Sequence, residues 1–192
     1  VKAISIPKAS AMSNHLRSLT VEATFHKRLN DWTVRLITQY SSQYPGGGND
    51  AIIDGLRGNQ NFAAGEWQGY WGKPFEAVID LGRKTIVKEV GGSFLQNVGS
   101  WIWLPDKITF EVSDDGVNFQ KVAERKNEHP IDNMKPRIQE YFLGITPVYT
   151  RYLRVRAENF GKIPSWHPGA GGDPWIFVDE IFIAGDPFGR EN

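Results

Sequence analysis

The 192-residue sequence contains no cysteine, which excludes disulfide bonds, thiol nucleophiles and zinc sites built on cysteine. It also has no surplus of one charge, because 22 basic residues balance 22 acidic ones. Binding to nucleic acid or to an anionic membrane surface relies on a basic surplus, so this balance argues against nucleic acid as a partner. No apolar run approaches the roughly 18 residues of a membrane-spanning helix, and we expect no membrane insertion.

The chain begins with VKAISIPKAS, which does not have the pattern of a signal peptide. We interpret this start as a cut boundary, so that a secretion signal could lie upstream in a longer parent. Residues 1–30 show weak periodicity and predict an irregular linker with at most a short helix or edge strand. We expect one domain over residues 31–186 and a tail over 187–192.

Aromatic side chains are abundant, at 12% of the residues with seven tryptophans among them. A buried indole needs a partner for its N–H, and an exposed one is costly without a purpose. We therefore expect several of the tryptophans in the core and a few on a binding surface.

From Trp32 onward the pattern is that of strands, in which apolar and polar residues alternate. The clearest hairpin joins 107–113 to 119–122 through a turn at 114–116. A second predicted pair joins 136–144 to 151–159, with Leu153, Val155 and Ala157 inward. Further strands are expected over 32–40, 75–82, 85–96 and 175–185, and Gly91-Gly92 suggests a bulge or a close backbone approach. About eight strands separated by turn residues predict an antiparallel sandwich or jelly roll.

Six blocks in a fixed order carry a family resemblance that spans residues 32–185. They are AIIDG (51–55), Trp67, AVIDLG (77–82), FEVSDDGVNFQKV (110–122), TRYLRVRAEN (150–159) and VDEIFIAG (178–185). This order resembles the discoidin domains, also called coagulation factor V/VIII type C domains. The segments QYPGGGND, FLQNVGSWIWLP and WHPGAGGDPWIFVDE are similar to one subgroup, the C-terminal module of bacterial β-N-acetylhexosaminidases, or chitobiases.

The resemblance implies an all-β fold, an eight-stranded antiparallel jelly-roll β-sandwich of the galactose-binding-domain type, with an irregular N-terminal segment. It implies non-catalytic carbohydrate binding, with galactose- or N-acetylhexosamine-type sugars as ligands. The implied partners are a glycan and the catalytic domain of the same parent chain, a secreted or periplasmic glycoside hydrolase. The implied location is therefore extracellular or periplasmic.

The resemblance also implies a structural calcium ion, for which Asp54, Asn59 and Glu180 are the candidate ligands. Calcium takes six to eight oxygens, many of them backbone carbonyls of a tight loop. The loop departs from the family pattern, because Leu56 to Gln60 replace its usual second acid and threonine. Arg57 could instead fill the place of the cation by pairing with Asp54 or Glu180, which would make this a salt-bridged structural loop.

The candidate sugar-binding residues are Gln96, Asn97, Trp101, Trp103, His167 and Trp175. One face of a pyranose packs on an aromatic ring, and its hydroxyl rim binds planar polar groups such as amides and imidazole. Trp101 and Trp103 point to the same face if their segment is extended. The alternative is that these tryptophans fill the end of the barrel, and that the glycines of 164–175 let the loop pass closely over an aromatic ring.

No catalytic residues are predicted. Glycoside hydrolysis needs two carboxyl groups about 5–10 Å apart, whereas Asp114 and Asp115 lie in a turn and Asp179 and Glu180 should face opposite ways along a strand. A hexosaminidase barrel would itself need roughly 250 residues. Two rival functions stay open: a structural docking domain packed on the parent glycosidase without sugar binding, and adhesion to protein or lipid, which the Gly-, Asn- and Pro-rich loops disfavour.

Overall fold

The computed structural model describes residues 2–5, 21–24 and 30–186. The chain divides into two units, residues 1–30 and 31–192. In the first unit, β1 (Lys2–Ser5) pairs antiparallel with β2 (Val21–Thr24). The remainder of the predicted linker and the predicted tail over 187–192 lie outside the described residues.

The regular secondary structure of the second unit is almost entirely antiparallel strand, as predicted. Two short 3-10 helices, η1 (Asn49–Ile53) and η2 (Val98–Ser100), interrupt the loops. No helix in the described part of the chain is long and apolar enough to cross a membrane. The strands are β3 (Thr33–Leu36), β4 (Gln68–Trp71), β5 (Phe75–Gln96), β6 (Lys107–Ser113), β7 (Gln120–Lys126), β8 (Arg137–Glu158) and β9 (Trp175–Asp186).

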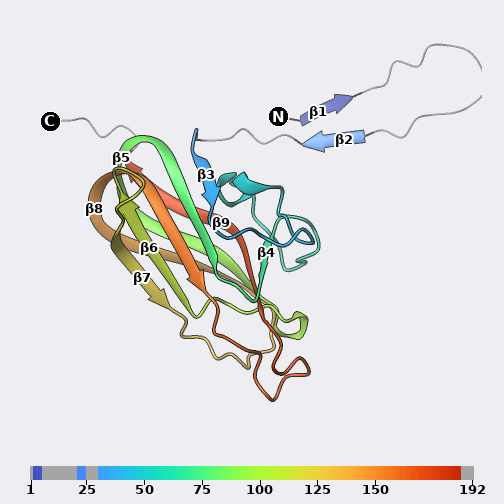
Figure 1. Cartoon of the computed structure of the whole chain (residues 1–192). Coiled ribbons are helices and arrows are strands. Elements are labelled where there is room, and N and C mark those ends of the chain that lie inside the picture. The colour runs from blue at the N-terminus through green and yellow to red at the C-terminus, as the bar shows by residue number, and fades with distance from the viewer. Residues whose placement is uncertain (1, 6–20, 25–29, 187–192) are drawn as a thin grey trace, which may run out of the picture. The chain divides into compact units, whose positions relative to one another are not determined.

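Two long strands, β5 and β8, contribute to both layers of a sandwich (Figure 1). The first half of β5 pairs with β3 and with the second half of β8, which β6 and then β7 extend. The second half of β5 pairs with the first half of β8 and with β9, which β4 extends. The jelly-roll sandwich expected from the sequence is thereby confirmed, with its layers joined through the bends of β5 and β8.

The bends explain why one predicted pairing is wrong. Residues 136–144 and 151–159 do not pair with each other, because they belong to the same strand, β8, and both pair with β5. Val87 pairs with Val148 and Glu89 with Gly144, so residues 145–147 stand opposite Lys88 alone. The strand passes between the layers at Arg151, which stands opposite residues 81–84 of β5, where the sequence suggested a reversal.

The predicted close approach at Gly91 is confirmed. A Cβ built on Gly91 would lie 2.0 Å from the carbonyl oxygen of Tyr141 on the adjacent strand. No residue with a side chain fits this position without moving the backbone of β8. The predicted hairpin is also confirmed, since β6 and β7 pair antiparallel.

The main core lies between the two layers. Leu153, Val155 and Ala157 are fully buried, as the alternation in their segment predicts. They pack with apolar residues of β5, β6 and β9, among them Phe75, Phe94, Phe110 and Val178. A smaller aromatic cluster around Trp67 and Phe177 lies toward the loop end of the sandwich.

Candidate functional site

The loops that follow β5, β7 and β8 lie together at one end of the sandwich (Figure 1). Hydrogen bonds join them: the Trp103 indole N–H donates to the Ile131 carbonyl at 2.8 Å, and the Gln96 amide donates to the Asn133 carbonyl at 2.9 Å. The loop 159–174 returns along the same end before β9 begins at Trp175. Exposed tryptophans concentrate here, at positions 71, 101 and 166.

Trp71 is the most exposed of these tryptophans, at 55%. It pairs in register with Trp175, and the two indoles stack with centroids 5.9 Å apart and an interplanar angle of 18°. Its Nε1–H donates to the Asp173 carbonyl at 2.8 Å. The Asp173 carboxylate accepts a hydrogen bond from Lys162 at 2.5 Å. We call Trp71, Lys162, Asp173 and Trp175 the Trp71 surface.

The Trp71 indole is held in place from beneath. Trp175 contacts Tyr44 edge-on at 5.3 Å and Phe177 at 5.7 Å, so the exposed ring rests on a packed aromatic layer. A ring fixed in this way loses little side-chain freedom when a ligand packs on its open face. An aromatic face beside an ammonium and a carboxylate is the arrangement that suits a pyranose ring.

Trp101 packs against the loop 159–174. Its backbone adopts the left-handed conformation, with φ 64° and ψ 24°, and its side chain is 38% exposed. The indole packs on Gly169, where a Cβ would approach within 2.6 Å of the ring, and on Gly172. The prediction that the loop's glycines allow close packing on an aromatic ring is therefore confirmed.

Three of the predicted sugar-binding side chains are buried and bonded inside the protein. Trp103, Gln96 and His167 are 1%, 1% and 4% exposed. The Nδ1 of His167 accepts the Gly169 N–H at 3.0 Å, so its Nε2–H donates to the Val98 carbonyl, also at 3.0 Å. These groups shape the loops from within and do not face a ligand in solvent.

Trp101 and Trp103 therefore do not share a face, which corrects the expectation for an extended segment. The left-handed turn at Trp101 sends its side chain outward, while Trp103 is sealed beside Phe160. Asn97 is half-buried, and its backbone exchanges hydrogen bonds with Ile102. Of the predicted set, Trp101 and Trp175 lie at the loop rim.

Asp179 and Glu180 also depart from the sequence expectation, because their side chains do not point to opposite faces of the strand. Ser93 pairs with Glu180 and Phe94 with Val178, so Asp179 is the extra residue of a β-bulge. A bulge interrupts the alternation that would send consecutive side chains to opposite faces. Both carboxylates therefore reach the loop 54–60.

Backbone N–H groups of that loop donate to both acids. Gly58 donates to Asp179 at 2.7 Å, and Gly55 donates to Glu180 at 2.8 Å. Burial raises the pKa of Asp179, and burial raises the pKa of Glu180 to about 8, with Asp54 and Asp179 adding to the effect. The two carboxyl groups therefore hold a loop in place beneath the surface.

The fit of calcium to Asp54, Asn59 and Glu180 can be judged from these contacts. Asp54 accepts the Leu56 N–H at 2.8 Å, and the Asn59 carbonyl accepts the Trp67 indole N–H at 2.9 Å. Asp179 Oδ1 is buried without a hydrogen-bond donor among the described residues. Across the described ranges, no three His, Asp or Glu side chains converge as a group able to hold a metal. The donor set does not fit calcium.

The other carboxylate pair is a turn, as predicted. Asp115 accepts N–H groups from Asn118 and Val117 at 2.8 Å, and these bonds hold its pKa well below its usual range. A carboxylate so stabilised in its ionised form is a poor proton donor.

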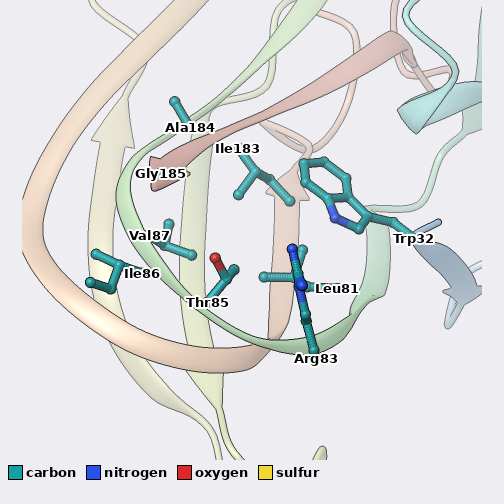
Figure 2. Close-up of a pocket in the computed structure, with 9 residues that line it drawn as sticks. All are labelled: Trp32, Leu81, Arg83, Thr85, Ile86, Val87, Ile183, Ala184 and Gly185. Atoms are coloured by element: carbon teal, nitrogen blue, oxygen red, sulfur yellow. The ribbon is translucent and has the colours of Figure 1, made fainter. Parts of the chain in front are cut away.

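A hollow of about 300 Å³ lies at the opposite end of the sandwich, where β5 bends (Figure 2). Leu81 and Val87 are its buried apolar wall, and Trp32, Arg83 and Ile183 stand around it. Its wall is largely apolar, with Arg83 as the planar polar group among its lining residues, whereas a sugar rim needs several such groups. The loop end is therefore the better glycan candidate.

Sequence reasoning missed Trp71, Lys162 and Asp173. Trp71 comes at the end of a four-residue strand in QGYWGKP, and nothing local distinguishes it from a core tryptophan. Its role depends on the register of β4 against β9, which places it opposite Trp175. The signal that the sequence offered was a tryptophan at the end of one strand, Trp71, and another at the start of a second strand, Trp175.

Comparison with known proteins identifies the family of the chain. The F5/8 type C domain model matches residues 37–172, and the chain belongs to this family. No curated protein is a significant match.

Solved structures with the same fold include several carbohydrate-binding modules. A CBM32 module from Clostridium perfringens, in complex with GalNAc-β-1,3-galactose, has a TM-score of 0.51 and 16% identity, covering 79% of this chain and 94% of that one. The C-terminal domain of a chitobiase from Bacteroides fragilis has a TM-score of 0.50 and 17% identity, covering 83% and 96%. A chitosan-binding module from a Paenibacillus chitosanase/glucanase has a TM-score of 0.51 and 14% identity, covering 84% and 100%. These likenesses show the fold.

Proposed function

We propose that this chain is a non-catalytic carbohydrate-binding module of a secreted or periplasmic glycoside hydrolase of the β-N-acetylhexosaminidase type. It binds galactose- or N-acetylhexosamine-type sugars. The family and the fold support the class of function. The observation that carries the proposal is the Trp71 surface, an exposed indole fixed on Trp175 beside the Lys162–Asp173 pair.

The chemistry of recognition follows from that arrangement. The C–H face of the sugar packs on the open face of Trp71, and its hydroxyls exchange hydrogen bonds with the Lys162 ammonium and the Asp173 carboxylate. Trp101, which is 38% exposed and packs on Gly169 and Gly172 of the same loop end, offers a second ring to a longer glycan.

Single-site affinity should be weak. The rim is shallow, and each sugar hydroxyl exchanges a water hydrogen bond for a protein one at small net gain. The module then raises the effective concentration of the parent enzyme near its substrate, and the chemistry of that enzyme is unchanged.

Calorimetric titration with galactose, N-acetylgalactosamine and N-acetylglucosamine tests the proposal. Trp71→Ala should weaken binding about tenfold, the value of one lost aromatic contact of roughly 1–1.5 kcal/mol. Tyr149→Ala is the matched control, because Tyr149 is 46% exposed and pairs with Ile86 near the bend, far from the loops. Equal losses in both variants, or no binding of any of the three sugars at millimolar concentration, would contradict the proposal.

The docking-domain alternative has an observation of its own. Phe142 is 53% exposed and stacks on Phe182 at 4.8 Å on an outer sheet face, away from the loops. A docking domain predicts that Phe142→Ala and deletion of the module destabilise the full-length enzyme, while Trp71→Ala has no effect on any sugar titration.

A further inference from the structure

The loop 54–60 contacts the sheet through backbone N–H donors, whereas calcium requires oxygen ligands. A calcium ion draws in oxygens, including backbone carbonyls, and is repelled by N–H donors. Here Gly55 and Gly58 direct their N–H groups at Glu180 and Asp179. Asp54 is turned to the Leu56 N–H of its own loop.

Trp67 also contacts the loop 54–60 and holds it against the core. The Trp67 indole N–H donates a hydrogen bond to the Asn59 backbone carbonyl at 2.9 Å, and the Asn59 side-chain oxygen accepts the Asn61 N–H at 2.7 Å. Gly58 packs on the same indole so closely that a Cβ would lie 2.4 Å from the ring. Trp67 is 1% exposed, so this side of the loop is part of the core.

Arg57 supplies a positive charge to this region and joins the loop to the sheet. Its guanidinium lies 4.0 Å from the centroid of the Phe182 ring and forms an ion pair with Glu140 at 3.1 Å. Phe182 stacks in turn on Phe142, with Gly91 between them in register. The sequence left open a pairing of Arg57 with Asp54 or Glu180, and the structure gives Glu140 as its ion-pair partner.

We infer that hydrogen bonds to Asp179 and Glu180, together with Arg57, hold the loop 54–60 in this module, so that its conformation and the stability of the domain do not depend on calcium. Each buried carboxylate accepts one backbone N–H of the loop, and the Arg57 guanidinium contacts the Phe182 ring and pairs with Glu140. This inference is independent of glycan binding, because the loop and the Trp71 surface share no residue.

The first test is the thermal unfolding of the purified protein in excess EDTA and in millimolar calcium. A ligand that binds only the folded state raises the midpoint by mass action, so we expect the two midpoints to agree within about 1 °C. A midpoint several degrees higher in calcium, or calorimetric heat of calcium binding, would overturn the inference.

The second test removes the charge and the stacking with Arg57→Met. We expect a lower melting midpoint in both buffers and faster amide hydrogen exchange at residues 54–60. Arg125→Met is the matched control, because the Arg125 side chain has the same 42% exposure and also pairs with an acid, Glu128, at the surface. If Arg57→Met changes neither midpoint nor exchange beyond the control, Arg57 does not hold the loop.

Discussion

At the scale of single residues, backbone conformation decides which tryptophans at the loop end are exposed and which are buried. Trp103 lies in the interior with its N–H on the Ile131 carbonyl, while Trp101, two residues earlier, is turned outward by a left-handed φ of 64°. A non-glycine residue in this conformation is uncommon and costs energy that the surrounding contacts must offset. The packing of the Trp101 indole on Gly169 and Gly172 provides such contacts.

His167 is a structural residue at this scale, and its removal should be measured as a loss of stability. His167→Ala leaves the Val98 carbonyl and the Gly169 N–H without partners in a buried site. We expect the free energy of unfolding to fall by about 2–4 kcal/mol in urea denaturation.

The comparison with His167→Gln makes that prediction specific. A glutamine amide both donates and accepts, so this variant should lose clearly less stability than the alanine variant. If the two substitutions cost the same, the hydrogen bonds of His167 do not carry its contribution.

At the scale of elements, the bends and bulges of the long strands decide where functional groups lie. The bulge at Asp179 brings two adjacent acids to one loop, and the irregularity at residues 81–84 of β5, opposite Arg151 of β8, carries both strands from one layer to the other. In both places a strand departs from its alternation, and in both the consequence lies in a contact distant in sequence.

The contact of β5 with β8 at Gly91 should tolerate no side chain. Gly91→Ala would place a methyl group 2.0 Å from the Tyr141 carbonyl oxygen. We expect this variant to lose about 3 kcal/mol of unfolding free energy, or to fail to fold, since the strand backbone must move.

Gly144→Ala is its control on the adjacent strand. No atom lies within 4 Å of a Cβ at Gly144, and its backbone φ is not in the left-handed region. This variant should be neutral or slightly more stable, because alanine restricts the unfolded chain. A loss of equal size in both variants would refute the steric argument.

At the scale of the whole molecule, the domain has two chemically different ends. Strand β9 runs about 30 Å from Trp175 at the loops to Gly185 at the bend, at roughly 3.3 Å per residue. Trp32, near the start of this unit, and Gly185, near its end, both line the hollow in Figure 2. The proposed glycan end is thus remote from the points where the chain enters and leaves the sandwich.

The outer face of one layer carries ion pairs across neighbouring strands, and these should make the whole domain sensitive to acid. Arg151 pairs with Asp80 at 2.8 Å through two hydrogen bonds, and Arg154 and Arg156 pair with Glu111 and Glu76. The Arg151 hydrogen bonds, with the Gly82 N–H, hold the pKa of Asp80 below its ordinary value of 3.8.

A lowered pKa means that the stabilisation by Asp80 is complete above pH 4 and is lost as the pH falls through its folded-state pKa. We expect Asp80→Asn to lower the melting midpoint by a few degrees at pH 7, as befits a partly exposed pair worth up to about 1 kcal/mol. The difference from the unmodified protein should narrow as the pH falls through the lowered pKa of Asp80. Asp132→Asn, at an exposed carboxylate of the 127–136 loop, should show no such convergence. A constant difference at all pH values would contradict the assignment.

Much of the fold could be read from short-range patterns. The inward set Leu153, Val155 and Ala157 and the hairpin of β6 and β7 follow from alternation and turn residues, which act over a few positions. The site could be read less well. Trp71 was missed because its partner Trp175 is a hundred residues away, and His167 and Trp103 were candidates because a loop sequence does not show which side chains turn inward.

The order of apolar and polar residues by itself predicted an antiparallel sandwich, because strand periodicity and turn chemistry are local properties. The F5/8 type C family was indicated by the resemblance of six sequence blocks and is shown by the family model. Tertiary structure alone decided that one indole of the Trp101–Trp103 pair is exposed, that Asp179 and Glu180 reach one loop, and that Arg57 pairs with Glu140. These outcomes depend on strand register and bulges, which arise from packing between segments distant in sequence.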